Sequence, residues 1–354
     1  MIRFLRTLDP VVAWRRLAVQ HRPLAVSALA TVGLLALFLL GLVLDPRTIG
    51  GAPAWLKPAK FGVSIAVYSF TLLWLLGHLR RDRRWRDWTV RIAGWTVVVV
   101  FAIELLAIGL QAARGTTSHF NYATPFDAAL FVLMGNAITV LLVVNVAVAA
   151  LVLSQRFASR SLGAGLRWGM AITVLGMAQA FLMVMPTAQQ LAGWQAGGDV
   201  TIIGAHSVGA PDGLAADGAT PAAAMPVTGW RTDVGDLRVG HFVGLHGLQV
   251  IPLLAAWLQR RRLRELQRSA LVHVAGGGYL GLTLLLTWQA LRAQPLLRPD
   301  ALTVGTFVAL VAACALATWV VLRRVPPAAE GAAGAADGTA GAAASAGAGA
   351  RVGV

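Results

Sequence analysis

Eight long runs of apolar residues, separated by mostly short polar connections, constrain the fold of this chain more than any other feature. Each run is about as long as the ~20 residues that a helix needs to cross the hydrocarbon core of a bilayer. Only 13% of the 354 residues are charged, whereas about a quarter are charged in soluble domains. The sequence therefore predicts an all-α, polytopic transmembrane helix bundle with eight spans. The runs cover residues 24–44, 61–79, 92–112, 126–153, 168–185, 241–258, 271–291 and 301–322.

The positive charges of the connecting segments alternate between the two sides of the predicted bundle. With the N-terminus placed in the cytoplasm, 22 of the 30 Lys and Arg residues fall in cytoplasmic segments and eight fall on the opposite side. Because cytoplasmic loops are enriched in Lys and Arg, this asymmetry predicts that both termini are cytoplasmic. The net charge of +15 is then explained by topology and by contact with anionic lipid at the cytoplasmic face, so no nucleic-acid partner is expected.

Three further segments flank or interrupt the predicted membrane domain of residues 23–325. Residues 1–22 are a basic cytoplasmic leader, either an interfacial helix or a plain polar segment. Residues 186–240 form an outer loop rich in Gly, Ala, Pro and Asp, and a loop this long is usually functional or disordered; its part 210–224 is expected to be a flexible tip. Residues 326–354 are rich in Ala and Gly, which predicts a disordered cytoplasmic tail.

Composition also bounds the setting of the protein. Cys314 is the only cysteine, which excludes an intrachain disulfide and a cysteine-based metal site. The abundance of Ala, Gly and Arg is typical of a GC-rich bacterial genome, so we expect a multi-pass protein of the bacterial plasma (inner) membrane. The lipid bilayer is one expected partner of this protein, and a second membrane protein or further copies of the same chain are candidate partners. His21 and His206 are expected to face solvent.

Short sequence marks recur between the two halves of the chain. Lys60-Phe61 at the start of the second run is matched by His241-Phe242 in the sixth, at an offset of 181 residues, and a pair of arginines follows at the same distance in both. The third and seventh runs end in similar four-residue motifs at an offset of 178. The pattern indicates a 4+4 parallel repeat, although such short matches between Ala- and Leu-rich helices also arise by chance.

Polar residues within the runs gather in their outer halves. Among them is Glu104 of the third run, whose carboxylate is costly to bury in a membrane. A lone carboxylate at this depth has to be protonated, paired or hydrated. Glu104 is therefore a candidate catalytic residue that accepts protons, with a structural ion pair as the alternative. Gln111 shares its helix face, because the two residues are seven apart.

Three histidines are candidate ligands on the outer side. His241 and His246 fall with Gln249 on one broad face of the sixth run, and His119 lies in the loop after the third. Histidine is the usual protein ligand of haem iron, copper and zinc, so His246 and His241 are predicted metal ligands and His119 a further cofactor-binding residue. Alternatively, the residues of the sixth run only form hydrogen bonds between helices, and His119 caps a helix end.

The sixth run carries two further structural signals. Gly240, Gly244 and Gly247 share a second face, which would let a neighbouring helix approach closely. Pro252 predicts a kink just below the polar face.

Lys57 and Lys60 stand at the outer start of the second run, on the side where basic residues are sparse. They are predicted to bind an anionic group such as a carboxylate or a phosphate; contact with lipid headgroups is the alternative. The other candidate substrate-binding residues on this side are Gln111, Arg114, Gln249, Asp236 and Arg238.

No motif names a reaction: the sequence has no P-loop, no HExxH, no CxxC and no GxSxG. Whether the protein is an enzyme stays open, and two function classes remain. The first is a membrane-embedded redox protein with haem or a transition metal as cofactor, His246 and His241 as ligands and Glu104 as proton handler. The second is a permease for a small solute, with Lys60, Glu104 and Gln249 along its path. An anion is one of the candidate solutes. Because the polar residues cluster on a single side of the membrane, the sequence favours the redox protein.

Overall fold

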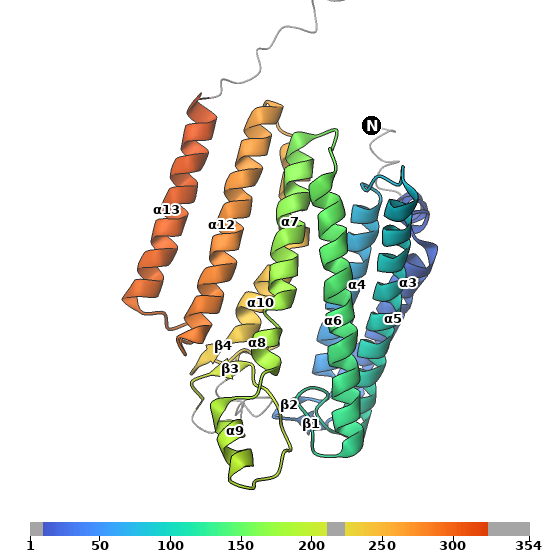
Figure 1. The fold of residues 1–354 in the computed structure, drawn as a ribbon, viewed down its shortest axis with the longest axis vertical. Coiled ribbons are helices and arrows are strands. Elements are labelled where there is room, and N and C mark those ends of the chain that lie inside the picture. The colour runs from blue at the N-terminus through green and yellow to red at the C-terminus, as the bar shows by residue number, and fades with distance from the viewer. Residues whose placement is uncertain (1–9, 211–223, 325–354) are drawn as a thin grey trace, which may run out of the picture.

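The computed structural model describes residues 10–210 and 224–324, which are mostly helical. Seven helices are long and apolar enough to cross a membrane, and a bent pair of helices makes an eighth candidate span. The protein is thus a multi-pass helical membrane protein (Figure 1). The predicted tail and nearly all of the predicted flexible tip lie outside the described residues, as does the first part of the leader.

The long helices overlap the predicted runs, but their bounds differ from the predicted ones and most begin earlier. α5, for example, begins at Arg84, well before the predicted start of the third run at residue 92. The helices are α2 (Pro10–Ala18), α3 (Arg22–Leu44), α4 (Leu56–Leu76), α5 (Arg84–Arg114), α6 (Pro125–Ser154), α7 (Arg160–Ala178), α8 (Phe181–Val184), α9 (Ala188–Gln195), α10 (Leu237–Leu245), α11 (Gly247–Leu258), α12 (Glu265–Leu291) and α13 (Ala301–Arg324).

Two short antiparallel ribbons lie at one end of the bundle (Figure 1). β1 (Thr48–Ile49) pairs with β2 (Ala52–Pro53) before α4. β3 (Ser207–Val208) pairs with β4 (Gly235–Asp236), which joins the two sides of the predicted outer loop. A large part of this loop is therefore ordered.

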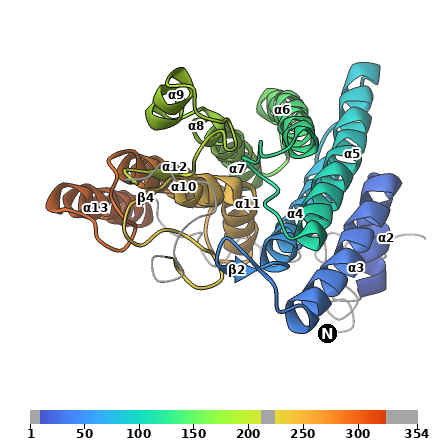
Figure 2. The same cartoon turned by 90° about the horizontal axis from the view of Figure 1, so that it is seen from below.

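The transmembrane helices pack largely in the order of the chain (Figure 2). α3 packs against α4 and α5, α4 against α5, α5 against α6, and α6 against α7. α7 then packs against α10, α11 and α12, and α12 against α13. Buried leucines such as Leu24, Leu73 and Leu76 fill the core between the first helices.

The outside of the bundle is covered by apolar side chains. Val43, Leu106 and Leu253 are 81%, 67% and 66% exposed. Soluble proteins rarely expose large contiguous apolar surfaces, so the surrounding medium is a lipid bilayer. α13 is the most peripheral helix, and none of the residues in its most apolar stretch is buried.

The predicted small-residue face of the sixth run is confirmed. An added Cβ at Gly244 would lie 2.7 Å from the backbone of Gly176 on α7, and one at Gly240 would clash with Thr287 on α12. Glycine therefore allows α10 to approach both helices closely.

The bend in the sixth run lies at His246 and not at Pro252, so the predicted position of the kink is wrong. α10 and α11 meet at an angle of 41°, whereas α11 continues through Pro252. The cause is Thr173 of α7, whose Oγ1 donates to Leu245 O (3.2 Å) and accepts from Leu248 N (3.0 Å). In a continuous helix Leu248 N would donate to the carbonyl four residues earlier, so the inserted hydroxyl opens the helix.

His21 and His206 are buried, with 7% and 5% of their surface exposed, so the prediction that they face solvent is wrong. His21 caps α3, because its Nδ1 accepts from Leu24 N (3.2 Å). His206, within the predicted outer loop, packs against the ring of Phe120. In both cases, segments that are distant in the sequence pack over the histidine side chain and bury it.

Candidate functional site

Glu104 occupies the inward face of α5 and is 2% exposed. Its Oε1 accepts no hydrogen bond from any residue that the structure describes. Lys57, in the first turn of α4, is the cation whose charge acts on it. An ionised carboxylate with an unmade hydrogen bond is costly inside a membrane. The carboxyl group of Glu104 is therefore stable as an anion only through Lys57, or else as a protonated acid.

His119 lies between α5 and α6 and packs against three phenylalanine rings, those of Phe61, Phe120 and Phe131, with centroid distances of 5.6, 6.3 and 6.0 Å. Burial lowers the pKa of His119 well below its ordinary value, and the positive charge of Lys57 acts in the same direction. The imidazole is thus neutral at pH 7. We call Lys57, Glu104 and His119 the outer cluster, because Lys57 interacts with both other residues.

Gln111 and Arg114 belong to a network that joins the end of α5 to the start of α6. Arg114 Nη1 and Gln111 Nε2 lie 2.6 and 2.7 Å from Oδ1 of Asp127. Thr124 caps α6 and donates to Asp127 Oδ2 (2.7 Å). Asp127 is not among the residues predicted from the sequence, although Thr124, followed by Pro125 and then by Asp127, is a recognisable start of a helix. Gln111 and Arg114, both predicted to bind substrate, therefore have a structural role in joining α5 to α6.

Asp236 and Arg238 anchor the outer loop to the start of α10. Arg238 donates from Nε to Asp236 Oδ1 (2.9 Å) and from Nη2 to Oδ2 (2.6 Å), and Nη2 also reaches Gly229 O (2.6 Å). Burial alone would raise the pKa of Asp236, but the hydrogen bonds and charge of Arg238 hold it below its usual value. Lys60 Nζ donates to Thr228 O (3.1 Å) in the same loop. The contact of Lys60 joins the loop to α4, and the contacts of Arg238 join it to α10.

The two predicted metal ligands are engaged elsewhere in the bundle. His241 Nδ1 lies 2.6 Å from Gly176 O of α7, and the ring of His246 packs edge-on against Phe242 at 4.4 Å. No hydrogen bond or electrostatic interaction within the described ranges links either histidine to Glu104. Nor do these ranges hold a group of three or more His, Cys, Asp or Glu residues that could bind a metal ion.

Gln249 links the bend between α10 and α11 to α4. One end of its amide lies 3.3 Å from Thr71 Oγ1, and the other lies 3.2 Å from Leu245 O and 3.3 Å from His246 O. On the same face of α4, Tyr68 donates to Asn145 Oδ1 of α6 (2.6 Å). Polar side chains thus meet in the middle of the bundle, below the outer cluster.

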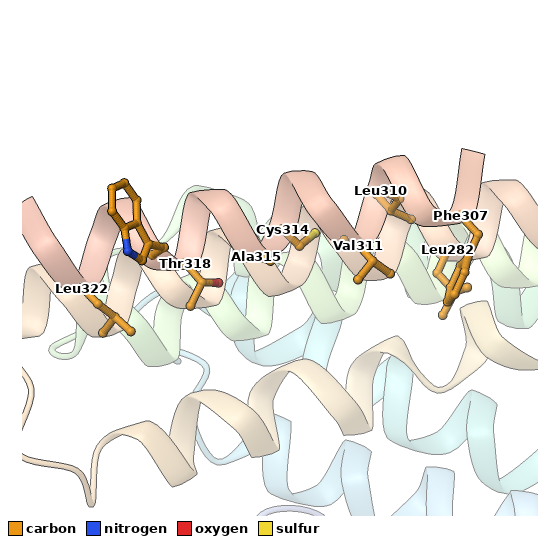
Figure 3. A pocket seen from close by; sticks show the side chains of 10 residues that line it. Leu282, Phe307, Leu310, Val311, Cys314, Ala315, Thr318 and Leu322 are labelled. Atoms are coloured by element: carbon orange, nitrogen blue, oxygen red, sulfur yellow. The ribbon is translucent and has the colours of Figure 1, made fainter. Parts of the chain in front are cut away.

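Two grooves lie on the apolar outside of the described helices. A groove of about 620 Å³ runs between α12 and α13 and is lined by apolar side chains such as Leu282, Phe307 and Leu322 (Figure 3). A second groove of about 500 Å³ lies along α5 beside Trp88 and Trp95. Neither groove includes a residue of the outer cluster.

The fold and the site together define a multi-pass helical membrane protein with a charged cluster at one side of the membrane. The chain matches no family model, no curated protein and no solved structure.

Proposed function

We propose that the protein is a permease for a small anionic solute, in which Lys57 binds the anion and Glu104 exchanges a proton in step with it. The observation that supports this most is the buried carboxyl group of Glu104, which has one oxygen without a hydrogen-bond partner among the described residues and Lys57 as its cation. Intramembrane carboxylates of this kind commonly mark ion or proton pathways.

The coupling follows from the charge balance of the outer cluster. His119 is neutral, so among the described residues Lys57 supplies the one positive charge that acts on Glu104. Two anions beside one cation repel each other strongly where the dielectric constant is low. When an anionic solute binds Lys57, Glu104 takes up a proton, and when the solute leaves, Glu104 releases it. Solute and proton therefore move together.

For the topology, we propose eight spans with both termini in the cytoplasm of a bacterial cell. α3 begins and α13 ends at the same end of the bundle, and the β-ribbons and α9 lie at the other (Figure 1). The arginine-rich connections after α4, α6 and α11 would then contact anionic lipid at the cytoplasmic face. The outer cluster would face the opposite side, where a solute arrives.

We also propose that the bundle consists of two parallel repeats of four spans. The packing order supports this: α3 contacts α4, α4 contacts α5, and α5 contacts α6. In the second half, α7 contacts α10 and α11, these contact α12, and α12 contacts α13. The bent pair α10 and α11 then corresponds to α4, which carries Lys57.

A second candidate function, a haem- or metal-binding redox protein, is favoured by the contact of His241 Nδ1 with Gly176 O (2.6 Å). Metal-ligating histidines usually donate the N–H of their other ring nitrogen to such a group. Metal analysis and absorbance of the purified protein test it: a Soret band or a bound transition metal would support it. Wild-type protein that neither contains nor takes up haem or metal would end it.

Uptake into proteoliposomes tests the permease. Radiolabelled phosphate, lactate and succinate serve as probe anions, with and without an imposed pH gradient. Wild-type protein is expected to accumulate at least one of them when the outside is acidic. Lys57→Met should abolish uptake, whereas Glu104→Gln should retain exchange of anion but lose the response to the gradient. Asp87→Asn, a change in an exposed ion pair with Arg91, is the control. Gradient-driven uptake by Glu104→Gln, or no uptake of any probe, would contradict the proposal.

A further inference from the structure

The groove of about 500 Å³ along α5 has the dimensions of a lipid chain. It lies on the outside of the bundle, between α5 and Val140 of α6. Ile92, Val99 and Val140 line it and are 50%, 52% and 53% exposed. From Trp88 to Val99 the groove is about 16 Å long at the helical rise of about 1.5 Å per residue. This is close to half of the ~30 Å hydrocarbon core, so the apolar part of the groove fits one acyl chain of one leaflet.

Two tryptophans mark one end of this groove as the membrane–water interface. Trp88 and Trp95 both line it, and each is 54% exposed. The ring of Trp95 packs edge-on against that of His21, which caps α3, at a centroid distance of 6.1 Å. Tryptophan rings concentrate at the level of the lipid headgroups. A lipid in the groove would therefore have its headgroup beside Trp88, in the first turns of α5.

Arginines supply the charge at this end of the groove. Arg91 lines the groove, and its side chain is 65% exposed. Of its guanidinium group, only Nε donates a hydrogen bond within the described residues, to Asp87 Oδ2 at 2.8 Å, so both Nη groups can donate to a further anion. Arg84 is exposed on the same helix face, one turn before Trp88 and two turns before Arg91. None of the residues that line the groove is acidic.

We propose that an anionic phospholipid binds in this groove, with its phosphate held by Arg91 and Arg84 and one acyl chain along the apolar side chains. A guanidinium group binds a phosphate through paired N–H donors, and basic pockets beside transmembrane helices commonly bind anionic headgroups. The positive group of a zwitterionic lipid would find no carboxylate on the groove, so the site selects an anionic lipid. The inference goes beyond the proposed function, because the groove includes no residue of the outer cluster.

The groove between α12 and α13 provides an internal comparison. It is larger, at about 620 Å³, but none of the residues that line it is charged. Lipid that occupies it meets only apolar side chains and Thr318. We therefore expect selection of the headgroup in the groove along α5 and none in the groove between α12 and α13.

Photolabelling of the purified full-length protein tests this site. Phosphatidylglycerol and phosphatidylcholine with the same diazirine-bearing acyl chain serve as probes, and mass spectrometry locates the labelled residues. Phosphatidylglycerol should label the groove along α5 several-fold more than phosphatidylcholine does. Arg91→Gln should reduce the labelling by phosphatidylglycerol about fivefold, and Arg84→Gln by a similar factor, which corresponds to about 1 kcal/mol for each arginine near an anionic lipid.

Two matched controls separate the groove from a general attraction of lipid to basic segments. Arg261→Gln removes another exposed arginine, whose guanidinium carbon lies 4.2 Å from the ring centroid of Trp257, and should leave the labelling of the groove unchanged. Val140→Trp fills the groove and should lower its labelling by phosphatidylglycerol. Val132→Trp, at an exposed position elsewhere on α6, should not.

Three results would overturn the proposal. Equal labelling of the groove by the two lipids would show that it holds bulk lipid without selecting the headgroup. Labelling that Arg91→Gln and Arg84→Gln both leave unchanged would show that the arginines do not hold the phosphate. A groove without any lipid label, in a protein that is a dimer in the same detergent, would show that a second copy of the chain covers it.

Discussion

Lys57 is the residue on which the charge balance of the outer cluster depends. Its position in the first turn of α4 places it where its charge acts on both Glu104 and His119. Lys60, one helical turn further on, instead donates to the outer loop at Thr228 O. Two lysines that look equivalent in the sequence thus differ in their interactions: the charge of Lys57 acts on the buried carboxyl group of Glu104, whereas Lys60 donates to the loop.

The pH dependence of stability should report the buried state of His119. Burial, together with the charge of Lys57, lowers the pKa of His119, so the unfolded chain binds a proton near pH 6.5 that the folded chain does not. Stability is therefore lost as the pH falls below about 6.5. We expect the Tm to decrease between about pH 7.5 and about pH 5, and to decrease less in His119→Phe. His21, whose pKa burial also lowers, contributes to the slope that remains. A slope that His119→Phe leaves unchanged would argue against a buried neutral imidazole.

Asp127→Asn tests the network between α5 and α6. The substitution weakens the pairing with Arg114, and an amide that turns its nitrogen toward Gln111 Nε2 leaves that group without an acceptor. We expect a loss of roughly 1–3 kcal/mol in the free energy of unfolding. Asp82→Asn, in an exposed ion pair with Arg86, should leave stability nearly unchanged. Equal effects of the two substitutions in thermal unfolding would show that the network is unimportant.

The sequence singled out Lys57, Glu104 and His119 as polar residues of the outer side, but it could not pair them. They come from α4, from α5 and from the following loop, and their proximity arises only when these elements pack. The same reason hides Asp127 as the partner of Arg114. Conversely, Asp236 and Arg238 are two residues apart, and their bidentate pairing was foreseeable from charge and spacing alone.

At the scale of secondary structure, the glycine contact between α7 and α10 decides how closely the second half packs. A Cβ at Gly176 would lie 2.6 Å from backbone atoms of Gly244 and Leu245. Backbone atoms cannot move aside as a flexible side chain can, so the helices would have to separate. This separation would also pull Thr173 away from the bend that it stabilises.

Gly176→Ala is accordingly expected to destabilise the protein by roughly 1–3 kcal/mol. Gly135→Ala in α6 is the matched control, because nothing lies within 4 Å of its added Cβ, and alanine favours the helix by up to about 1 kcal/mol. Thermal unfolding of both variants in the same detergent provides the comparison. Equal stability of the two variants would show that α7 and α10 are not in tight contact.

The existence of the helices could be predicted from the sequence, because a run of about 20 apolar residues has few alternatives in a membrane. The bend could not. The local signal, Pro252, lies within an intact α11, whereas the cause is the hydroxyl of Thr173 on another helix. A bend produced by a side chain far away in the sequence leaves no local pattern.

At the scale of the whole molecule, the proposed topology exposes the outer cluster on one side of the membrane and the arginine-rich connections on the other. Reporter fusions test this arrangement in cells. Alkaline phosphatase should be active when inserted at Gly213 and silent when fused after Arg324, because the enzyme is active only outside the cytoplasm. The reverse pattern would invert the topology and place Lys57 and Glu104 on the cytoplasmic side.

The most direct test of the central proposal is infrared difference spectroscopy of the reconstituted protein upon addition of a transported probe anion. If the anion displaces Glu104 from Lys57, the carboxyl group of Glu104 takes up a proton, and a protonated carboxyl C=O band should appear in the wild type. The same band should be missing in Glu104→Gln and in Lys57→Met. An anion-induced band that persists in Glu104→Gln, or anion binding to the wild type without any carboxyl band, would contradict coupled binding of proton and anion.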